Sequence, residues 1–201
     1  MLTIARLILA IAALTAIGQQ LTIHVAASYS VQNFFSYFTN LSNLSAALIL
    51  LLSVFANRSR SQDFAKYIST VNMAVVGLVF AVLLREVDLG ALLPWVNVVL
   101  HYVMPVGIVL NWLVAPPVSK LQSRHALLPL MFPAVYLIYI IVRGANTGWY
   151  PYPFLNPANV GGYGAVAAYS LAITTTVLLA SWALLVAGNR LHDSKSPNAS
   201  A

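Results

Sequence analysis

Six long apolar runs, separated by short polar loops, constrain this chain more than any other feature of its sequence. Each run has about 18 to 24 residues, and about 20 apolar residues are enough for a helix to cross the hydrocarbon core of a bilayer. Charged residues make up 7% of the chain, against roughly 25% in soluble domains. Because a backbone inside lipid must satisfy its own hydrogen bonds, the sequence predicts an all-α, polytopic membrane protein, a bundle of six transmembrane helices.

The expected spans form a single domain, residues 1–190. No other stretch is long and polar enough for a separate soluble domain, and the tail, residues 191–201, is expected to be disordered. A cleaved signal peptide is not expected at the start, because the first apolar core is long and no cleavage site stands out. The expected spans are residues 3–23, 34–56, 69–85, 94–115, 126–143 and 164–187.

The positive charges predict the orientation of the bundle. Eight of the ten Lys and Arg residues flank the expected spans on one side, and only Arg85 and Arg143 lie on the other. By the positive-inside rule, both termini are expected in the cytoplasm, in a multi-pass protein of the plasma (inner) membrane. The same rule accounts for the net charge of +6, so no nucleic-acid partner is expected.

Two polar features interrupt the apolar spans. His101 stands within PWVNVVLHYVMPVGIVLNWLV, and an ionisable side chain at membrane depth is costly enough to favour a functional role. Pro105 has no N–H for the carbonyl of residue 101, which predicts a kink there, either an ordinary proline kink or a functional one. Four further polar residues share one helix face by their i, i+3, i+4, i+7 spacing: Ser36, Thr39, Asn40 and Asn43.

These features suggest a nucleophile and its base. Counted along their spans at ~1.5 Å per residue, Thr39 and His101 lie on the order of 8–10 Å below the outer boundary. A neutral imidazole can accept the hydroxyl proton of Thr39, whose oxygen then attacks an ester carbonyl. Asn40 or Asn43 could donate to the oxyanion, and Asn97, four residues before His101, could fix the imidazole tautomer. Simpler interpretations stay open, because membrane threonines often bond to their own helix and buried histidines often bridge helices.

The outer end of the expected bundle holds further candidates. Arg85 and Arg143 could hold a substrate carboxylate, could snorkel to lipid headgroups, or could pair with a neighbouring acid. Ser36 is a third candidate contact for the substrate. The long loop GANTGWYPYPFLNPANVGGYG, with three prolines and an aromatic cluster, is either an ordered cap over the outer face or an interfacial anchor.

Cofactors and metals are not expected. The chain has no cysteine, which excludes disulfides, thiolate metal sites and cysteine nucleophiles. Three metal ligands cannot be assembled at one depth of the expected bundle, and no glycine-rich phosphate loop follows a strand.

Four short motifs follow one another between about residues 34 and 164: SYFTNLSN, LLREVD, PWVNVVLHYVMP and TGWYPYPF. In this order they resemble the family of the androgen-induced protein and the androgen-dependent TFPI-regulating protein, with its small bacterial relatives. The resemblance implies a multi-span membrane protein with Thr39 as nucleophile and His101 as catalytic histidine. It also implies hydrolysis of fatty acid esters of hydroxy fatty acids, the activity of the animal members. The chain departs from the pattern where Val98 follows Asn97, because animal members commonly have another histidine there.

The sequence therefore predicts an intramembrane hydrolase of lipid esters, which uses Thr39 and His101 on a lipid or fatty-acyl ester and contacts membrane lipids. Transfer of the acyl group to an alcohol, instead of water, stays open. A second hypothesis is a transporter or channel for a small solute, which needs polar residues through the full thickness; Asn72 and Asn111 lie deeper than the cluster. A third is a non-catalytic membrane scaffold.

Overall fold

The computed structural model describes residues 1–87 and 90–195, and within these residues the chain forms helices and no strand. The predicted all-α fold is confirmed, and the protein is a multi-pass integral membrane protein by the length and composition of its helices. Six helical stretches of the described chain are long and apolar enough to cross a membrane: Leu2–Ala26, Phe38–Phe55, Arg60–Leu84, Pro94–Val114, Ser123–Thr147 and Tyr163–Lys195.

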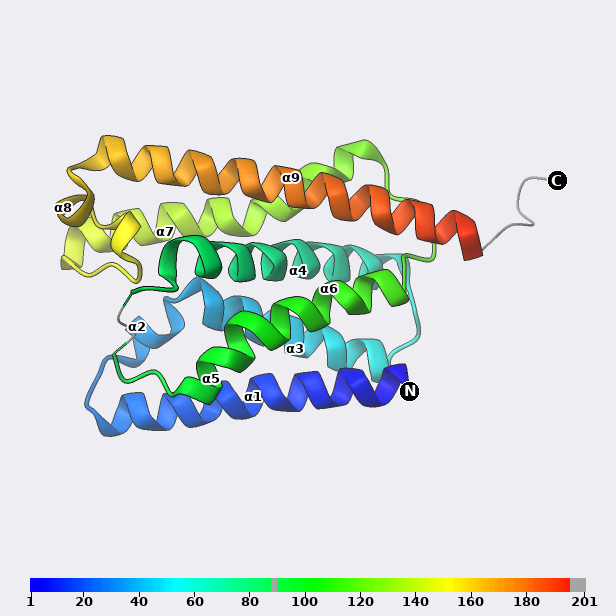
Figure 1. The fold of residues 1–201 in the computed structure, drawn as a ribbon, viewed down its shortest axis with the longest axis horizontal. Coiled ribbons are helices and arrows are strands. Elements are labelled where there is room, and N and C mark those ends of the chain that lie inside the picture. The colour runs from blue at the N-terminus through cyan, green and yellow to red at the C-terminus, as the bar shows by residue number, and fades with distance from the viewer. Residues whose placement is uncertain (88–89, 196–201) are drawn as a thin grey trace.

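The long helices lie side by side along the longest axis of the molecule (Figure 1). The start of α1 and the end of α9 lie at one end of the bundle, here called the terminal end. The opposite end, the loop end, carries α2, α8 and the loops around them. The α-helices are α1 (Leu2–Ala26), α2 (Val31–Phe35), α3 (Phe38–Phe55), α4 (Arg60–Val79), α5 (Pro94–Val98), α6 (Met104–Val114), α7 (Met131–Thr147), α8 (Pro157–Val160) and α9 (Tyr163–Lys195). The π-helical turns are η1 (Phe80–Leu84) and η2 (Val99–Val103), and the 3₁₀ turns are η3 (Ser123–Leu130) and η4 (Pro153–Leu155).

Small side chains let the helices approach closely. Ala10 and Ala13 of α1 pack with Ala46 and Ala47 of α3, all of them fully buried. Helices in lipid associate through such close packing, because lipid tails are as apolar as the side chains they would replace. The outward faces are apolar instead, with large exposed hydrophobic residues such as Ile4, Ile8, Ile11, Val135, Ile138, Val142, Leu171 and Leu179.

Charged side chains join the loops at the terminal end. Asp63 is 1% exposed and lies 3.6 Å from Arg58 and 3.9 Å from Lys66. Its Oδ2 also accepts a hydrogen bond of 2.6 Å from the N–H of Val118. The carboxylate thus lies beside two cations and holds the loop after α6 by a hydrogen bond. A buried charge is tolerated when it is paired and hydrogen-bonded in this way.

Most span boundaries shift by one to a few residues from the sequence prediction, and three of the differences bear on the description of the fold. The second span begins at Phe38, since Tyr37 is extended and separates α3 from the short α2. The third span begins at Arg60 rather than residue 69, because Ser59 caps the helix by accepting from the N–H of Gln62. The last helix continues to Lys195, so residues 191–195 are helical where a disordered tail was expected; the rest of that tail lies outside the described residues.

Candidate active site

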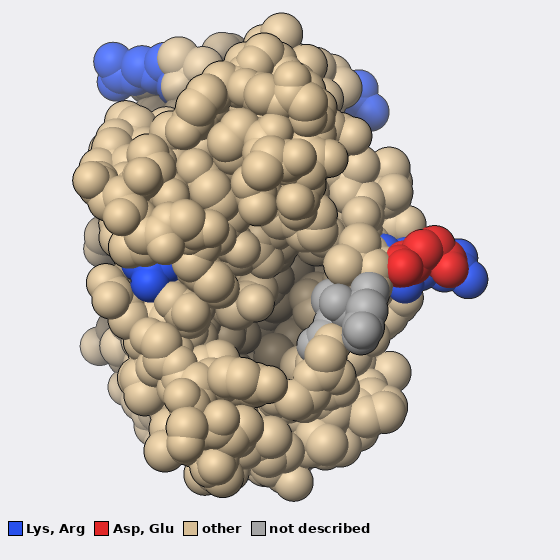
Figure 2. Space-filling view, turned by 90° about the vertical axis from the view of Figure 1, so that its left-hand side faces the viewer, with Lys and Arg blue, Asp and Glu red and all other residues tan. Residues whose placement is uncertain are grey.

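A cavity of about 540 Å³ opens at the loop end of the bundle. Figure 2 shows this end of the molecule, with a hollow in the middle of the face bordered largely by uncharged residues. The walls come from α1, α2, the start of α3, η1, η2 and the loop that contains η4. Thr39 and His101, the predicted nucleophile and base, both line this cavity.

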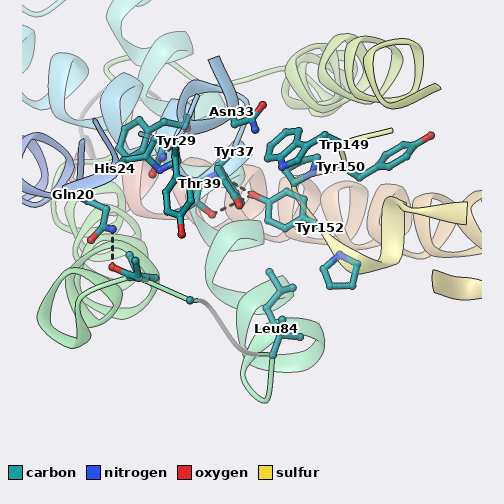
Figure 3. Close-up of a pocket in the computed structure, with 18 of the residues that line it drawn as sticks. Gln20, His24, Tyr29, Asn33, Tyr37, Thr39, Leu84, Trp149, Tyr150 and Tyr152 are labelled. Atoms are coloured by element: carbon teal, nitrogen blue, oxygen red, sulfur yellow. Dashed lines mark hydrogen bonds between the residues drawn. The ribbon is translucent and has the colours of Figure 1, made fainter. Parts of the chain in front are cut away.

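Thr39 is the second residue of α3, and the break at Tyr37 leaves its backbone N–H without a partner in the helix. Its N–H donates to the hydroxyl of Tyr152 at 3.2 Å, and its Oγ lies 3.4 Å from the same oxygen (Figure 3). Burial raises the pKa of Tyr152 to about 12, so this phenol keeps its proton near neutral pH. Thr39 therefore lies at the positive end of an 18-residue helix, beside a hydroxyl that can donate.

His101 lies in the π-helical turn η2, where the sequence predicted a kink from Pro105. Its Nδ1 lies 2.7 Å from Oδ1 of Asn97 and 3.2 Å from the backbone oxygen of the same residue. Because a backbone carbonyl can only accept, Nδ1 donates to it, and in the neutral imidazole Nε2 then keeps its lone pair. The ring stacks on Phe80 at 4.0 Å between centroids and 20° between planes.

Gly77 makes room for this irregular turn. A Cβ on Gly77 would lie 3.0 Å from Cβ of Pro105 and 3.7 Å from the carbonyl oxygen of His101. The glycine thus lets α4 approach the turn at the place where proline has removed a helical hydrogen bond. The contacts between Asn97 and Nδ1 of His101 are those that the predicted role of Asn97, to fix the imidazole tautomer, requires.

The helices that carry Thr39 and His101 are neighbours. The side-chain amide of Asn43 donates to the carbonyl of Thr39 at 2.9 Å and to the carbonyl of Leu100 at 3.2 Å, which joins α3 to η2. In the described chain no hydrogen bond joins Thr39 to His101 directly; the hydroxyl bonds to Tyr152 instead. Such catalytic contacts are often loose without substrate and tighten when it binds.

The depth argument from the sequence is wrong in one respect. It counted Thr39 from residue 34, whereas α3 begins at Phe38 and α2 lies between this helix start and the loop end (Figure 1). Thr39 therefore lies in the first turn of its helix, and His101 lies further along its own span. The two reach one cavity because α2 displaces the start of α3 away from the loop end.

The predicted polar face divides into different roles. Asn40 lines the cavity, and its amide donates to the carbonyl of Phe34 at 2.8 Å, which leaves one N–H for a ligand. Both N–H groups of Asn43 are used in the bridge between helices, so Asn43 is not an oxyanion donor in this arrangement. Ser36 lies before α3 and outside the cavity lining, and its hydroxyl pairs with the carbonyl of Gln32 and the hydroxyl of Tyr139.

Neither arginine reaches into the cavity. Arg85 is exposed and pairs with Glu86 at 3.5 Å, one of the alternatives left open by the sequence. Arg143 donates to Oδ1 of Asn33 at 2.6 Å and lies over the ring of Trp149 at 4.7 Å. Asn33 and Trp149 line the cavity and Arg143 does not, so this guanidinium supports the wall, and its contact with a substrate carboxylate stays a prediction.

The loop after α7, which the sequence suggested as an ordered cap or an interfacial anchor, is ordered here and lines part of the cavity. Tyr37 packs edge-on against Trp149 and Tyr152, with ring centroids 5.7 and 5.8 Å apart (Figure 3). Gly144 lets the loop fold back, because a Cβ there would clash with the ring of Tyr150. The cap therefore forms part of the site and presents Tyr152 to Thr39.

The sequence assigned no role to most of the lining residues, among them Tyr152, Phe80 and His24. Tyr152 contacts Thr39, Phe80 stacks on His101, and His24 holds the carbonyl of Ser30 with its Nε2 at 2.8 Å. The only sequence signal for Tyr152 was its place in the motif TGWYPYPF, which does not identify a contact with α3. Phe80 and His24 belong to apolar runs that carry no local sign of a site.

No group of three His, Asp or Glu side chains among residues 1–87 and 90–195 could hold a metal ion. Comparisons with family models, with curated proteins and with solved structures found no match to this chain.

Proposed function

We propose that this protein hydrolyses lipid esters within the membrane, with Thr39 as nucleophile and His101 as general base. One observation carries the proposal. Thr39 and His101 border the same cavity, and the contacts of Nδ1 with Asn97 leave Nε2 of the imidazole as a proton acceptor. A hydroxyl nucleophile is weak until a base of this kind takes its proton.

The reaction would proceed through an acyl-threonine. Oγ of Thr39 bonds to the ester carbonyl carbon while its proton passes to Nε2 of His101. The tetrahedral intermediate then collapses, the bond to the leaving alcohol breaks, and the imidazolium returns the proton to that alcohol. A water molecule, deprotonated by the same imidazole, attacks the acyl-threonine and releases the carboxylic acid and the threonine hydroxyl.

The oxyanion of the intermediate has two local sources of support. Tyr152 is protonated and its hydroxyl lies 3.4 Å from Oγ of Thr39, close to where the carbonyl oxygen would bind. Asn40 has a spare N–H on the same wall of the cavity. The first turn of α3 adds the partial positive charge of a helix N-terminus.

The deeper polar residues favour this proposal over a conduit. Asn72 donates to Ile68 in its own helix, Asn111 accepts from Arg6 at 2.8 Å, and neither side chain lines the cavity that Thr39 and His101 border. Where α3, α4 and α6 meet, the described core contains a cluster of buried apolar residues, among them Leu50, Met73 and Met104, which offers a solute no polar groups. A path for a solute needs polar groups across the full thickness of the bundle.

The test is labelling by a fluorophosphonate probe, together with ester hydrolysis, in purified detergent-solubilised protein. We expect Thr39→Ser to retain labelling and some hydrolysis, and Thr39→Val to abolish both without loss of fold. His101→Ala is expected to lower hydrolysis by about 10²–10⁴-fold, the usual contribution of a general base.

Thr70→Val is the matched control, because Thr70 is equally buried, bonds to Lys66 in its own helix and lies outside the cavity. It should behave as wild type at matched thermal stability. Full hydrolysis by Thr39→Val, or a probe adduct mapped to another residue, would refute the assignment of the nucleophile.

A further inference from the structure

Two arginines at the terminal end of the bundle are held where α1, α3 and α6 meet. Arg6 of α1 donates from Nε to the side-chain oxygen of Asn111 at 2.8 Å and from Nη1 to the carbonyl of Ser53 at 3.1 Å. Arg58, which follows α3, donates from Nη2 to the carbonyl of Pro116, just after α6. The two guanidinium groups are near enough for their charges to act on each other. The fold therefore fixes both side chains in place.

The chain does not balance the positive charge at this place. Lys66 is the third cation of the group, and the charges of both arginines act on it. Among the described residues, only Asp63 forms an ion pair with any of the three cations. The carbonyl groups that they contact are dipoles without net charge. Three cations against one carboxylate leave an excess of two positive charges.

Part of each guanidinium remains available to a ligand. Within the described chain, Nη2 of Arg6 and the Nε and Nη1 groups of Arg58 make no hydrogen bond. The side chain of Arg58 is 46% exposed. A guanidinium presents its N–H groups as a planar fork that matches two oxygens of a phosphate. Two such groups with an excess of positive charge favour a phosphate as their ligand.

The surroundings of the two arginines favour a lipid as the source of that phosphate. The neighbouring apolar side chains of α1 and α3 are exposed on the outside of the bundle: Ile4 and Ile8 are each 61% exposed, Leu52 is 55% exposed and Phe55 is 79% exposed. Basic pockets between membrane-spanning helices bind anionic headgroups. A lipid whose headgroup lies at the arginines could lay its acyl chains along this apolar surface, whereas free phosphate gains nothing from it.

We propose that Arg6 and Arg58 bind the phosphate of an anionic phospholipid in the leaflet at the terminal end. A zwitterionic phospholipid carries its own ammonium group and cannot neutralise the excess charge, whereas phosphatidylglycerol can. The bound lipid would join the start of α1 to the ends of α3 and α6, at the opposite end of the bundle from the candidate active site (Figure 1). The lipid site is independent of the proposed hydrolase function, and it stands if that function fails.

Native mass spectrometry of the full chain in a neutral detergent, titrated with phosphatidylglycerol or phosphatidylcholine, measures the binding of each lipid. We expect the wild type to bind phosphatidylglycerol more tightly than phosphatidylcholine, and added salt to reduce the difference. Arg58→Gln should weaken the binding of phosphatidylglycerol about fivefold, the contribution of one basic residue beside a charged bilayer surface. Its affinity for phosphatidylcholine should not change. The double variant Arg6→Gln/Arg58→Gln should lose the preference between the two lipids.

Arg60→Gln is the matched control. Arg60 is exposed at the start of α4, at the same end of the bundle, and its guanidinium lies over the ring of Phe64 at 5.7 Å. The substitution removes the same charge and should keep the affinity of the wild type for phosphatidylglycerol. Arg6→Gln also removes the contacts of α1 with α3 and α6, so Arg58→Gln alone decides if the double variant cannot be purified.

Other results would overturn the proposal. An equal loss of affinity in Arg60→Gln would mean that only the net charge of the terminal end attracts the lipid. An unchanged affinity in Arg58→Gln, or equal binding of the two lipids by the wild type, would mean that the arginines do not select an anionic headgroup. Displacement of phosphatidylglycerol by the same concentration of inorganic phosphate would assign the site to free phosphate.

Discussion

The contact between Asn97 and His101 allows a sharp test of the proposed base. Asn97→Ala removes the acceptor Oδ1, which lies 2.7 Å from Nδ1, and leaves the backbone oxygen of the same residue at 3.2 Å. The imidazole keeps its tautomer, because the remaining carbonyl still accepts from Nδ1. It loses the shorter of the two contacts that hold the ring in position, so Asn97 acts as a positioning residue.

The expected loss is small and can be bounded. A buried hydrogen bond contributes about 0.5–1.5 kcal/mol net. Since about 1.36 kcal/mol in a barrier is a factor of ten in rate, kcat should fall roughly two- to tenfold. This is well below the loss of about 10²–10⁴-fold expected when the base itself is removed. KM should change little, since Asn97 lies outside the cavity lining.

The assay is steady-state ester hydrolysis at matched thermal stability, with Asn72→Ala as the control. Asn72 lies on α4, its side-chain amide donates to the carbonyl of Ile68 in its own helix at 3.0 Å, and it lies outside the cavity lining. Asn97→Asp retains an acceptor at the same position and should recover part of the activity lost in Asn97→Ala.

Two results would contradict the reasoning. Equal kcat values for Asn97→Ala and Asn72→Ala would mean that the orientation of His101 does not matter to the reaction. A loss as large as that of His101→Ala would mean that the backbone carbonyl does not hold the tautomer, contrary to the geometry described above.

Three further variants and one topology experiment probe other parts of the structure. Tyr152→Phe keeps the ring in the cap and removes its hydroxyl, so kcat should fall about 10²-fold with little change in melting temperature if it serves the oxyanion. Arg143→Gln should raise KM equally for a carboxylated ester and its methyl ester, since the guanidinium supports the wall. A larger rise in KM for the carboxylated ester would mean that Arg143 binds the substrate carboxylate. Gly188→Ala places a Cβ 2.6 Å from the ring of Trp112 and should destabilise the fold by about 1–3 kcal/mol in thermal unfolding, without changing kcat of the folded protein. Reporter fusions should place the C-terminus in the cytoplasm and α8 on the opposite side; the reverse result would overturn the charge argument.

The sequence was most informative where a feature depends on local pattern. The six spans follow from the length of the apolar runs, since a bilayer of fixed thickness sets the length of a helix. The irregular turn at His101 follows from Pro105, which removes a hydrogen bond within four residues. The contact between Asn97 and His101 follows from their i, i+4 spacing, which brings side chains together on any helix.

The break before Thr39 could not be predicted in the same way. The segment FFSYF contains neither proline nor glycine, and its apolar character continues that of the span. What ends α2 is tertiary: Tyr136 of α7 donates to the carbonyl of Ser36 at 2.8 Å, and Tyr139 pairs with the hydroxyl of Ser36 at 2.8 Å. These contacts join residues about a hundred positions apart, so no local pattern records them.

The roles of the arginines were undecided for a related reason. Arg85 and Arg143 both end an apolar span, and the sequence alone cannot show which way a long side chain turns. In the fold, Arg143 is held by Asn33 and Trp149, whereas Arg85 points to solvent with Glu86. The difference arises because α2 and the cap surround one arginine and leave the other exposed.

The break and the site depend on each other. In a continuous helix the N–H of Thr39 would pair with the carbonyl of Phe35, and Tyr152 would have no partner in α3. Breaking the helix at Tyr37 frees that N–H, and an unpaired backbone group in a membrane costs several kcal/mol. The hydroxyl of Tyr152 satisfies it at 3.2 Å, and Tyr136 satisfies the carbonyl of Ser36 on the other side of the break. The contacts that make the broken helix tolerable thus also place a protonated phenol beside the proposed nucleophile, in the wall of the cavity.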